Sequence, residues 1–133
     1  MSKMLPILIV SGVTQSRDGL AQVASKCKLR PVCCGTLAAA KALITRQQFA
    51  VVVCEDSLPD GNFHAMVGAG TRSRGRHPVI VVSSQGDWES YLHAMRAGAF
   101  DCLSSSSGTD EVERILATAL QEYRRSAETV AQL

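Results

Sequence analysis

The sequence contains no apolar run long enough to cross a membrane. A membrane-spanning helix needs about 20 mostly apolar residues, whereas the first apolar run is only LPILIV (5–10). The opening segment, MSKMLPILIV, also lacks the long apolar stretch and small-residue cleavage site of a signal peptide. We therefore interpret residues 5–10 as a first buried strand and expect the protein to be cytoplasmic.

The chain has little excess of charge of either sign. Its formal net charge is +2 over 133 residues, and 20% of the residues are charged. This is too small an excess to predict nucleic-acid binding without a concentrated basic patch. Arg72, Arg74 and Arg76 form the one local cluster, which we interpret as a solvated loop or helix end. No direct contact with nucleic acid is expected.

Metal-ligand and disulfide patterns are missing as well. The five cysteines form no Cys-x-x-Cys pair, and the three histidines supply no zinc spacing. A serine nucleophile would need a histidine base nearby, and no histidine is expected beside Ser83. We therefore predict neither an enzyme, a metal site nor a cofactor. The residues concerned are Cys27, Cys33, Cys34, Cys54, Cys102, His64, His77 and His93.

What the sequence does contain is a regular alternation of short apolar runs and helical patterns. The runs have the continuous apolar character of strands buried on both faces, which indicates a parallel sheet. Right-handed crossovers then place helices on both sides of it. We predict a flavodoxin-like (βα)5 three-layer α/β sandwich with strand order 2-1-3-4-5. Expected strands are 5–10, 31–34, 50–55, 78–84 and 99–103, and expected helices are 15–27, 36–48, 62–75, 87–98 and 109–125.

This pattern fills one domain over residues 1–125. Residues 126–133 either extend the last helix or form the cut end of a longer chain. Thr36 and Thr109 are expected to cap the helices that follow them, and Gly98 to end the helix before it.

Polar residues gather where the predicted strands end. Ser11 and Gly12 follow the first strand, Glu55 ends the third, Ser83 ends the fourth, and a serine loop (104–107) follows the fifth. Because the carboxyl ends of parallel strands meet at one edge of a sheet, we expect these groups to converge there.

Four motifs along residues 5–124 together resemble the receiver domain of two-component response regulators (CheY-like). ILIV precedes the position of that family's acidic pair, and VVVCEDSLPDG resembles its third strand, in which an Asp stands four residues before the Pro. PVIVVSS resembles its fourth strand, which ends in Thr or Ser. RAGAFDCL resembles its fifth strand, which is normally followed by Lys-Pro.

The resemblance also identifies what this chain has lost. The positions of the two Mg²⁺-binding acids are occupied by Ser11 and Gly12, the phosphorylated Asp by Glu55, and the conserved Lys by Ser105. Cys102 stands at the aromatic switch position, and only the Thr/Ser position keeps its type, as Ser83. Phosphoryl transfer to a carboxylate needs a divalent ion and a nearby cation, and a hard cation needs carboxylate oxygens. The match is therefore to an atypical pseudo-receiver.

Glu55 itself allows two interpretations. It is a fixed charge that imitates a phosphorylated acid and locks one conformation, or it is a relic of a disused site. Its extra methylene moves the carboxylate by about 1.5 Å, and a misplacement of about 1 Å can cost about a hundredfold in rate. We expect Ser83, Ser84, the serine loop and backbone N–H groups to be its hydrogen-bond donors. Asp56 should point to the other side of the strand, as a turn acid.

The leading functional hypothesis is a phosphorylation-independent signalling module that acts by protein–protein contact. Its partner would be a histidine kinase, an output domain or another signalling protein, and a homodimer could form through 87–98, 99–103 and 109–125. Trp88, Tyr91, His93 and Arg96 are the candidate contact residues, although core packing is the favoured interpretation of Trp88 and Tyr91.

Two alternatives remain open. The serine loop before a helix N-terminus could bind a small ligand, an anion or a nucleotide. The turn SLPDG instead resembles receivers that are the N-terminal part of a transcriptional regulator.

Overall fold

The computed structural model describes residues 4–67 and 77–131 and contains a five-stranded parallel sheet. Its strand order is β2-β1-β3-β6-β7, which confirms the predicted order 2-1-3-4-5. Two further two-residue strands form a small separate hairpin. The bounds of the main strands are β1 Leu5–Val10, β2 Leu29–Cys34, β3 Val51–Glu55, β6 Val79–Ser83 and β7 Asp101–Ser104.

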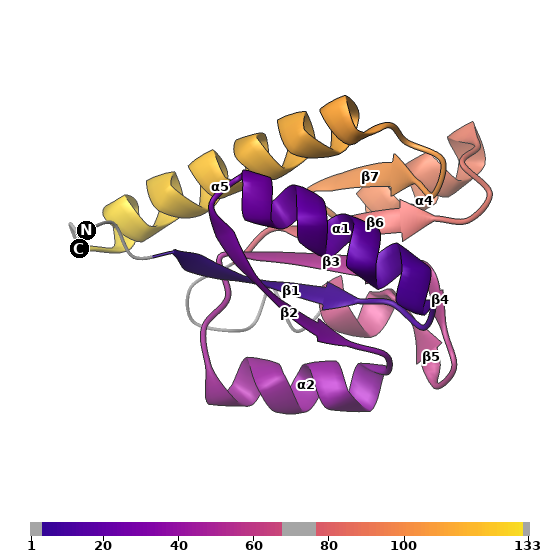
Figure 1. Cartoon of the computed structure of the whole chain (residues 1–133), viewed down its shortest axis with the longest axis horizontal. Coiled ribbons are helices and arrows are strands. Elements are labelled where there is room, and N and C mark those ends of the chain that lie inside the picture. The colour runs from indigo at the N-terminus through magenta and orange to yellow at the C-terminus, as the bar shows by residue number, and fades with distance from the viewer. Residues whose placement is uncertain (1–3, 68–76, 132–133) are drawn as a thin grey trace.

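Helices cover both faces of this sheet (Figure 1). Successive strand residues point to opposite faces, so Ile7 and Ile9 join one core while Leu8 and Val10 join another. The first core packs against α1 (Thr14–Lys26) and α5 (Thr109–Ala131). The second packs against α2 (Leu37–Arg46), α4 (Trp88–Ala97) and the segment 63–67. The continuous Val/Ile runs of the sequence therefore follow from burial on both faces.

The register brings the strand ends to one edge. Val10 pairs with Cys34 on one side and Cys54 on the other, and Glu55 pairs with Val82. Ser83 pairs with Ser104. Every polar group that follows these strands consequently leaves the sheet at the same rim.

Several local predictions differ from the structure. β2 begins at Leu29, two residues before the expected start. A small hairpin of β4 (Ser57–Leu58) and β5 (Gly61–Asn62) occupies the region expected to be only a turn and a helix start. The helix expected over 62–75 is described only as 64–67. Its remainder, with Arg72, Arg74 and Arg76, lies outside the described residues.

Helix termini follow their sequence signals with one exception. Thr36 accepts a hydrogen bond from Ala39 N at the start of α2, and Gly98 ends α4 with a left-handed φ of 108°. α5 begins at Thr109 itself, and Val112 N donates to Gly108 O, so Gly108 holds the cap position instead of Thr109. α5 continues to Ala131. Within the described residues, no helix has the length and apolarity of a membrane span.

Candidate functional site

Glu55 and Ser11 meet at the centre of the rim. Ser11 follows β1, is fully buried, and donates a hydrogen bond from its hydroxyl to Glu55 Oε1. The same hydroxyl oxygen accepts from Val13 N at 3.1 Å, which closes a tight turn at the start of α1. The donors expected for Glu55 were Ser83, Ser84 and the serine loop. That part of the prediction was wrong, because the carboxylate turns toward the β1–α1 loop. The backbone donors that were also expected are present, as the N–H groups of Val13 and Gly12.

The environment of Glu55 disfavours its charged form. Burial, and then repulsion from Asp56, raise the pKa of the Glu55 carboxyl above its ordinary value. The backbone N–H groups of Val13 and Gly12 and the positive charge of Arg17 act in the opposite direction but do not cancel the rise. Glu55 is thus a carboxylate held in a partly desolvated position without a direct ion pair to a basic side chain among the described residues.

Arg17 is a site residue that the sequence reasoning missed. Its guanidinium donates to Ser11 O at 2.8 Å and to Thr14 Oγ1 at 3.1 Å. It also lies over the backbone of Gly35, where an added Cβ would come within 2.9 Å of Nη1. The sequence offered one signal for this role: Arg17 lies in the first turn of the helix that follows β1, close to the strand end. Arg17 ties α1 to the β1 end and to the loop after β2.

Ser83 and Ser105 are joined to each other instead of to Glu55. Ser105 N donates to Ser83 O at 2.9 Å, and the buried hydroxyl of Ser83 accepts from Gly86 N at 3.1 Å. The serine loop is closed by its own bonds, with Ser104 N donating to Ser107 Oγ at 3.0 Å. The position that resembles the family's Lys therefore supplies a backbone contact and a short hydroxyl.

The rim does not fit a divalent ion. No group of three His, Cys, Asp or Glu side chains within the described ranges could hold one. Ser11 offers a hydroxyl that is already bonded to Glu55, and Gly12 has no side chain. An added Cβ at Gly12 would lie 3.3 Å from the ring of Pro59, so the loop is closely packed there.

Comparisons with known proteins agree with this architecture. No family model matches the chain. The chain is 26% identical to the response regulator protein PilR of Pseudomonas aeruginosa over 91% of its own length and 27% of that protein's length. The crystal structure of the signal receiver domain of a putative Luxo repressor protein from Vibrio parahaemolyticus superposes with a TM-score of 0.86 at 16% identity, covering 96% of this chain and 98% of that one.

A third similarity is to the beryllofluoride-activated NtrC4 receiver domain dimer, with a TM-score of 0.80 and 22% identity over 89% of this chain and 98% of that one. The chain therefore has the fold of CheY-like receiver domains, and its sequence resembles that of a response regulator. It spans about a quarter of the length of the curated relative it matches.

Asp56 follows Glu55 and lies on the other side of β3. It accepts hydrogen bonds from Ser84 N at 3.2 Å and Ser84 Oγ at 3.4 Å, and so bridges the ends of β3 and β6. Asp60, in the turn that follows, caps the start of α2. Asp60 accepts from Leu37 N at 2.8 Å and Ala38 N at 3.0 Å, and these bonds lower the pKa of its carboxyl.

The position that resembles the family's aromatic switch is held by a small side chain. Cys102 is half-buried on β7, and burial followed by repulsion from Asp101 raises the pKa of its thiol to about 11. It is therefore a neutral thiol at neutral pH and lacks the ring that an aromatic switch would swing.

Trp88 is exposed, which contradicts the favoured interpretation of core packing. Its side chain is 68% exposed at the start of α4 and stacks on Tyr91 with ring centroids 5.3 Å apart. His93 turns instead toward Phe63 and His64, with ring centroids 5.8 and 4.9 Å away. Arg96 is exposed near the end of the same helix. The α4 candidates thus form an aromatic pair, a histidine cluster and a separate cation.

Proposed function

We propose that this receiver domain is a signalling module whose state is not set by phosphorylation of residue 55. The single observation that carries the proposal is the hydrogen bond between the Ser11 hydroxyl and the Glu55 carboxylate. It joins the position matched to an acid of the family's ion-binding pair directly to the position matched to its phosphoacceptor. An ion and a phosphoryl group would both have to displace this bond.

The charge around the rim supports the same conclusion. Transfer of a phosphoryl group needs positive charge placed on the moving oxygens. The basic side chain that acts on Glu55, Arg17, is already bonded to Ser11 O and Thr14 Oγ1. Ser105, at the position of the family's Lys, contributes no positive charge.

The output of the module is proposed to be protein contact through α4, β7 and α5. The stacked pair of Trp88 and Tyr91 supplies an exposed aromatic surface on α4, and aromatic residues are enriched at protein interfaces. Partners of the kind expected from the resemblance are a histidine kinase, an output domain, or a second copy of this domain. The matched region is 27% of the length of PilR, so the rest of that protein leaves room for an output domain.

The experiment is incubation with Mg²⁺ and a small phosphodonor, followed by intact-mass measurement and amide NMR with beryllofluoride. We expect no added phosphoryl mass and no shift of the rim amides. The matched control is the variant Ser11→Asp, Gly12→Asp, Glu55→Asp, Ser105→Lys, which restores the missing groups on the same scaffold and should gain the modification if it folds. Modification of Glu55 or Asp56 in the unaltered chain would refute the proposal.

A further inference from the structure

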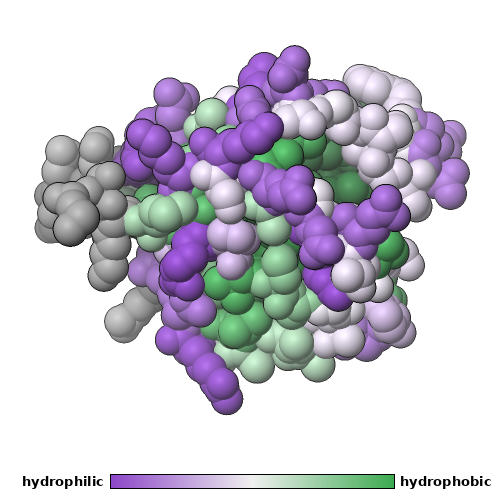
Figure 2. All heavy atoms as spheres, viewed as in Figure 1, coloured by the Kyte–Doolittle hydropathy of each residue, from purple (hydrophilic) through white to green (hydrophobic). Residues whose placement is uncertain are grey.

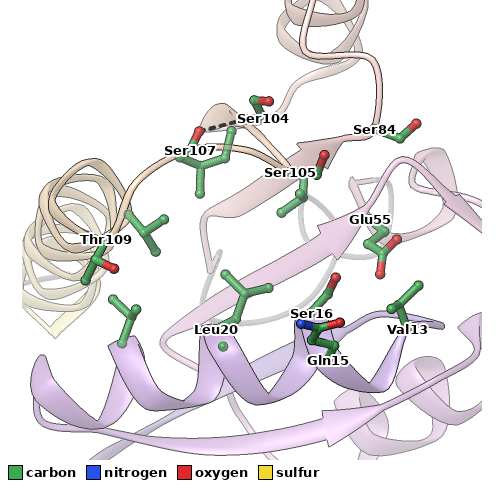
Figure 3. A pocket seen from close by; sticks show the side chains of 15 residues that line it. Val13, Gln15, Ser16, Leu20, Glu55, Ser84, Ser104, Ser105, Ser107 and Thr109 are labelled. Carbon is green, nitrogen blue, oxygen red and sulfur yellow. Dashed lines mark hydrogen bonds between the residues drawn. The ribbon is translucent and has the colours of Figure 1, made fainter.

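A cavity of about 380 Å³ opens beside Glu55, between α1 and the loop that leads from β7 into α5. Small-ligand sites typically occupy about 300–1,000 Å³. Figure 2 shows a hollow on the face that carries α1 and α5, with apolar surface at its floor and polar groups around it. Figure 3 shows the side chains that line the cavity from α1 below and from the serine loop above.

The floor of the cavity is apolar. Val82 and Leu103 come from the sheet, Leu20 and Val23 from α1, and Val112 from α5. All except the half-buried Leu20 are buried in the protein. An apolar group placed over these side chains would remove further apolar surface from water, which is favourable by about 25 cal/mol per Å².

The rim of the cavity offers hydrogen-bonding groups that the fold does not use. Within the described part of the chain, no hydrogen bond engages the side chains of Gln15, Ser16, Ser105 or Thr109, all of which line the cavity. Each hydroxyl can donate one hydrogen bond and accept two. By contrast, Ser104 and Ser107 are occupied within their own loop.

The charge of the cavity selects the kind of ligand. Among the 15 described residues that line it, Glu55 is the one with a formal charge. Figure 3 shows the Glu55 side chain at the edge of the cavity, beside Val13. The nearby cation, Arg17, is bonded to Ser11 O and lies over Gly35, toward the β2 edge. An anion such as a phosphate would therefore meet a carboxylate, and the described lining of the cavity offers it no basic side chain. This argues against the anion or nucleotide alternative.

We propose that this cavity binds a small molecule that joins a protonated amine to an apolar body. The amine contacts the Glu55 carboxylate and neighbouring serine hydroxyls, and the apolar body covers Leu20, Val82 and Leu103. The ligand would contact α1, the end of β3 and the start of α5 together, and so could set the position of α5 in place of a phosphate. This inference rests on the proposed function, since it requires an unmodified Glu55.

Three probes of similar size test it: phenethylamine, 2-phenylethanol and phenylacetate, which carry a positive charge, no charge and a negative charge. Titration of the uniformly ¹⁵N-labelled protein should shift the amides of Gly19, Ser105 and Val112 with phenethylamine. We expect the amine to bind at least about fivefold more tightly than the alcohol, the effect of one partly buried charge pair, and the anion to bind most weakly.

Three variants isolate the charge. Glu55→Gln should abolish the preference for the amine over the alcohol while the alcohol still binds, whereas Glu89→Gln on α4, outside this cavity, should leave the preference unchanged. Ser105→Lys places a cation on an exposed loop position of the rim and should reverse the preference toward phenylacetate. Thermal unfolding of each variant confirms that it is folded.

The proposal would be overturned if phenylacetate bound as tightly as phenethylamine. It would also be overturned if no probe bound at concentrations up to about 10 mM, where only very weak affinities remain to be detected. A preference that survives Glu55→Gln would do the same. The proposed function is tested separately: a gain of phosphoryl mass by the unaltered protein, without any probe present, would contradict it.

Discussion

Replacing Ser11 with Ala tests the contact on which the site depends. The substitution removes the hydroxyl that donates to Glu55 Oε1 and leaves a partly desolvated carboxylate with one donor fewer. A hydrogen bond to a charged group contributes about 1.5–3 kcal/mol. Because Glu55 is only half-buried, water replaces part of the loss, and we expect a cost of about 1–2 kcal/mol. For a chain of this size the melting temperature should fall by about 4–7 °C.

The assay is a double-mutant cycle in urea with Glu55→Ala as the second change. Without the carboxylate, Ser11→Ala should cost less by about 1 kcal/mol, which is the coupling free energy. The cost that remains comes from the lost bond between Val13 N and the Ser11 hydroxyl. Ser107→Ala is the matched control, because Ser107 lies on the same cavity but its hydroxyl accepts from Ser104 N and not from Glu55. It should show no coupling. An equal cost of Ser11→Ala with and without Glu55 would refute the hydrogen bond and, with it, the proposed function.

The same pair has a pH signature with a definite sign. Since the folded pKa of Glu55 is raised, the folded protein takes up this proton at a higher pH than the unfolded chain does. Ionised Glu55 therefore lowers stability above its folded pKa, and stability recovers as the pH falls through that pKa toward the unfolded value. The difference in unfolding free energy between the wild type and Glu55→Ala isolates this term, and Ser11→Ala should enlarge it. A difference independent of pH would contradict the raised pKa.

Three further predictions concern other parts of the domain. Gly98→Ala should lower the unfolding free energy, measured in urea, by about 1–3 kcal/mol. The reason is that φ at this position is 108° and the new Cβ would lie 3.2 Å from Val67 Cγ1. An unchanged midpoint of unfolding would contradict the left-handed cap. Trp88→Ala should change stability by less than about 0.5 kcal/mol, since the side chain is 68% exposed, while weakening self-association or partner binding in sedimentation or titration; a large loss of stability would show that Trp88 is packed. Thiol labelling at neutral pH should modify the exposed Cys33 first and the buried Cys54 last, because burial raises the pKa of the Cys54 thiol to about 12. Mass spectrometry of partly labelled protein gives the order of modification. Early labelling of Cys54 would contradict its burial.

The sheet was predictable because strands that are buried on both faces require a recognisable sequence pattern. LPILIV, AVVVCE and PVIVVSS are continuous apolar runs, and strands covered by helices on both faces require such runs. The order of the strands then follows from short right-handed crossovers. The start of β2 was less visible because Arg30 and Pro31 interrupt its apolar character, as expected for a strand at the sheet edge.

The small hairpin and the site contacts were not predictable in the same way. β4 and β5 are two residues each, too short for any periodic signal. The partner of Glu55 depends on the direction in which one side chain leaves the end of β3, which spacing alone does not fix. Arg17 was overlooked for a related reason: its role arises from a reach across the loop to Ser11 O, and nothing in the local sequence distinguishes it from another solvated helix residue.

The prediction that Trp88 packs in the core was wrong for a different reason. It lies at the first position of α4, directly after the Asp87 cap, and only Ala94 of that helix is fully buried. Trp88, Tyr91, Leu92 and Met95 have the spacing of one helix face, and such a stripe predicts which side of a helix faces the sheet. The first turn of a helix can nevertheless extend past the sheet edge. Leu92 and Met95 are half-buried, whereas the aromatic residue that begins the stripe is exposed.

The geometry around Glu55 bears on whether it is a lock or a relic. A charge that imitates a phosphoryl group should be met by a cation, as the family's Lys would meet it. Here Ser11 and backbone groups surround the carboxylate, its pKa is raised, and Arg17 acts on it without a direct bond. A fixed charge so poorly compensated is a weak lock. The same lack of compensation makes it a good receptor for an incoming cation, because the ligand would relieve a cost that the fold already bears.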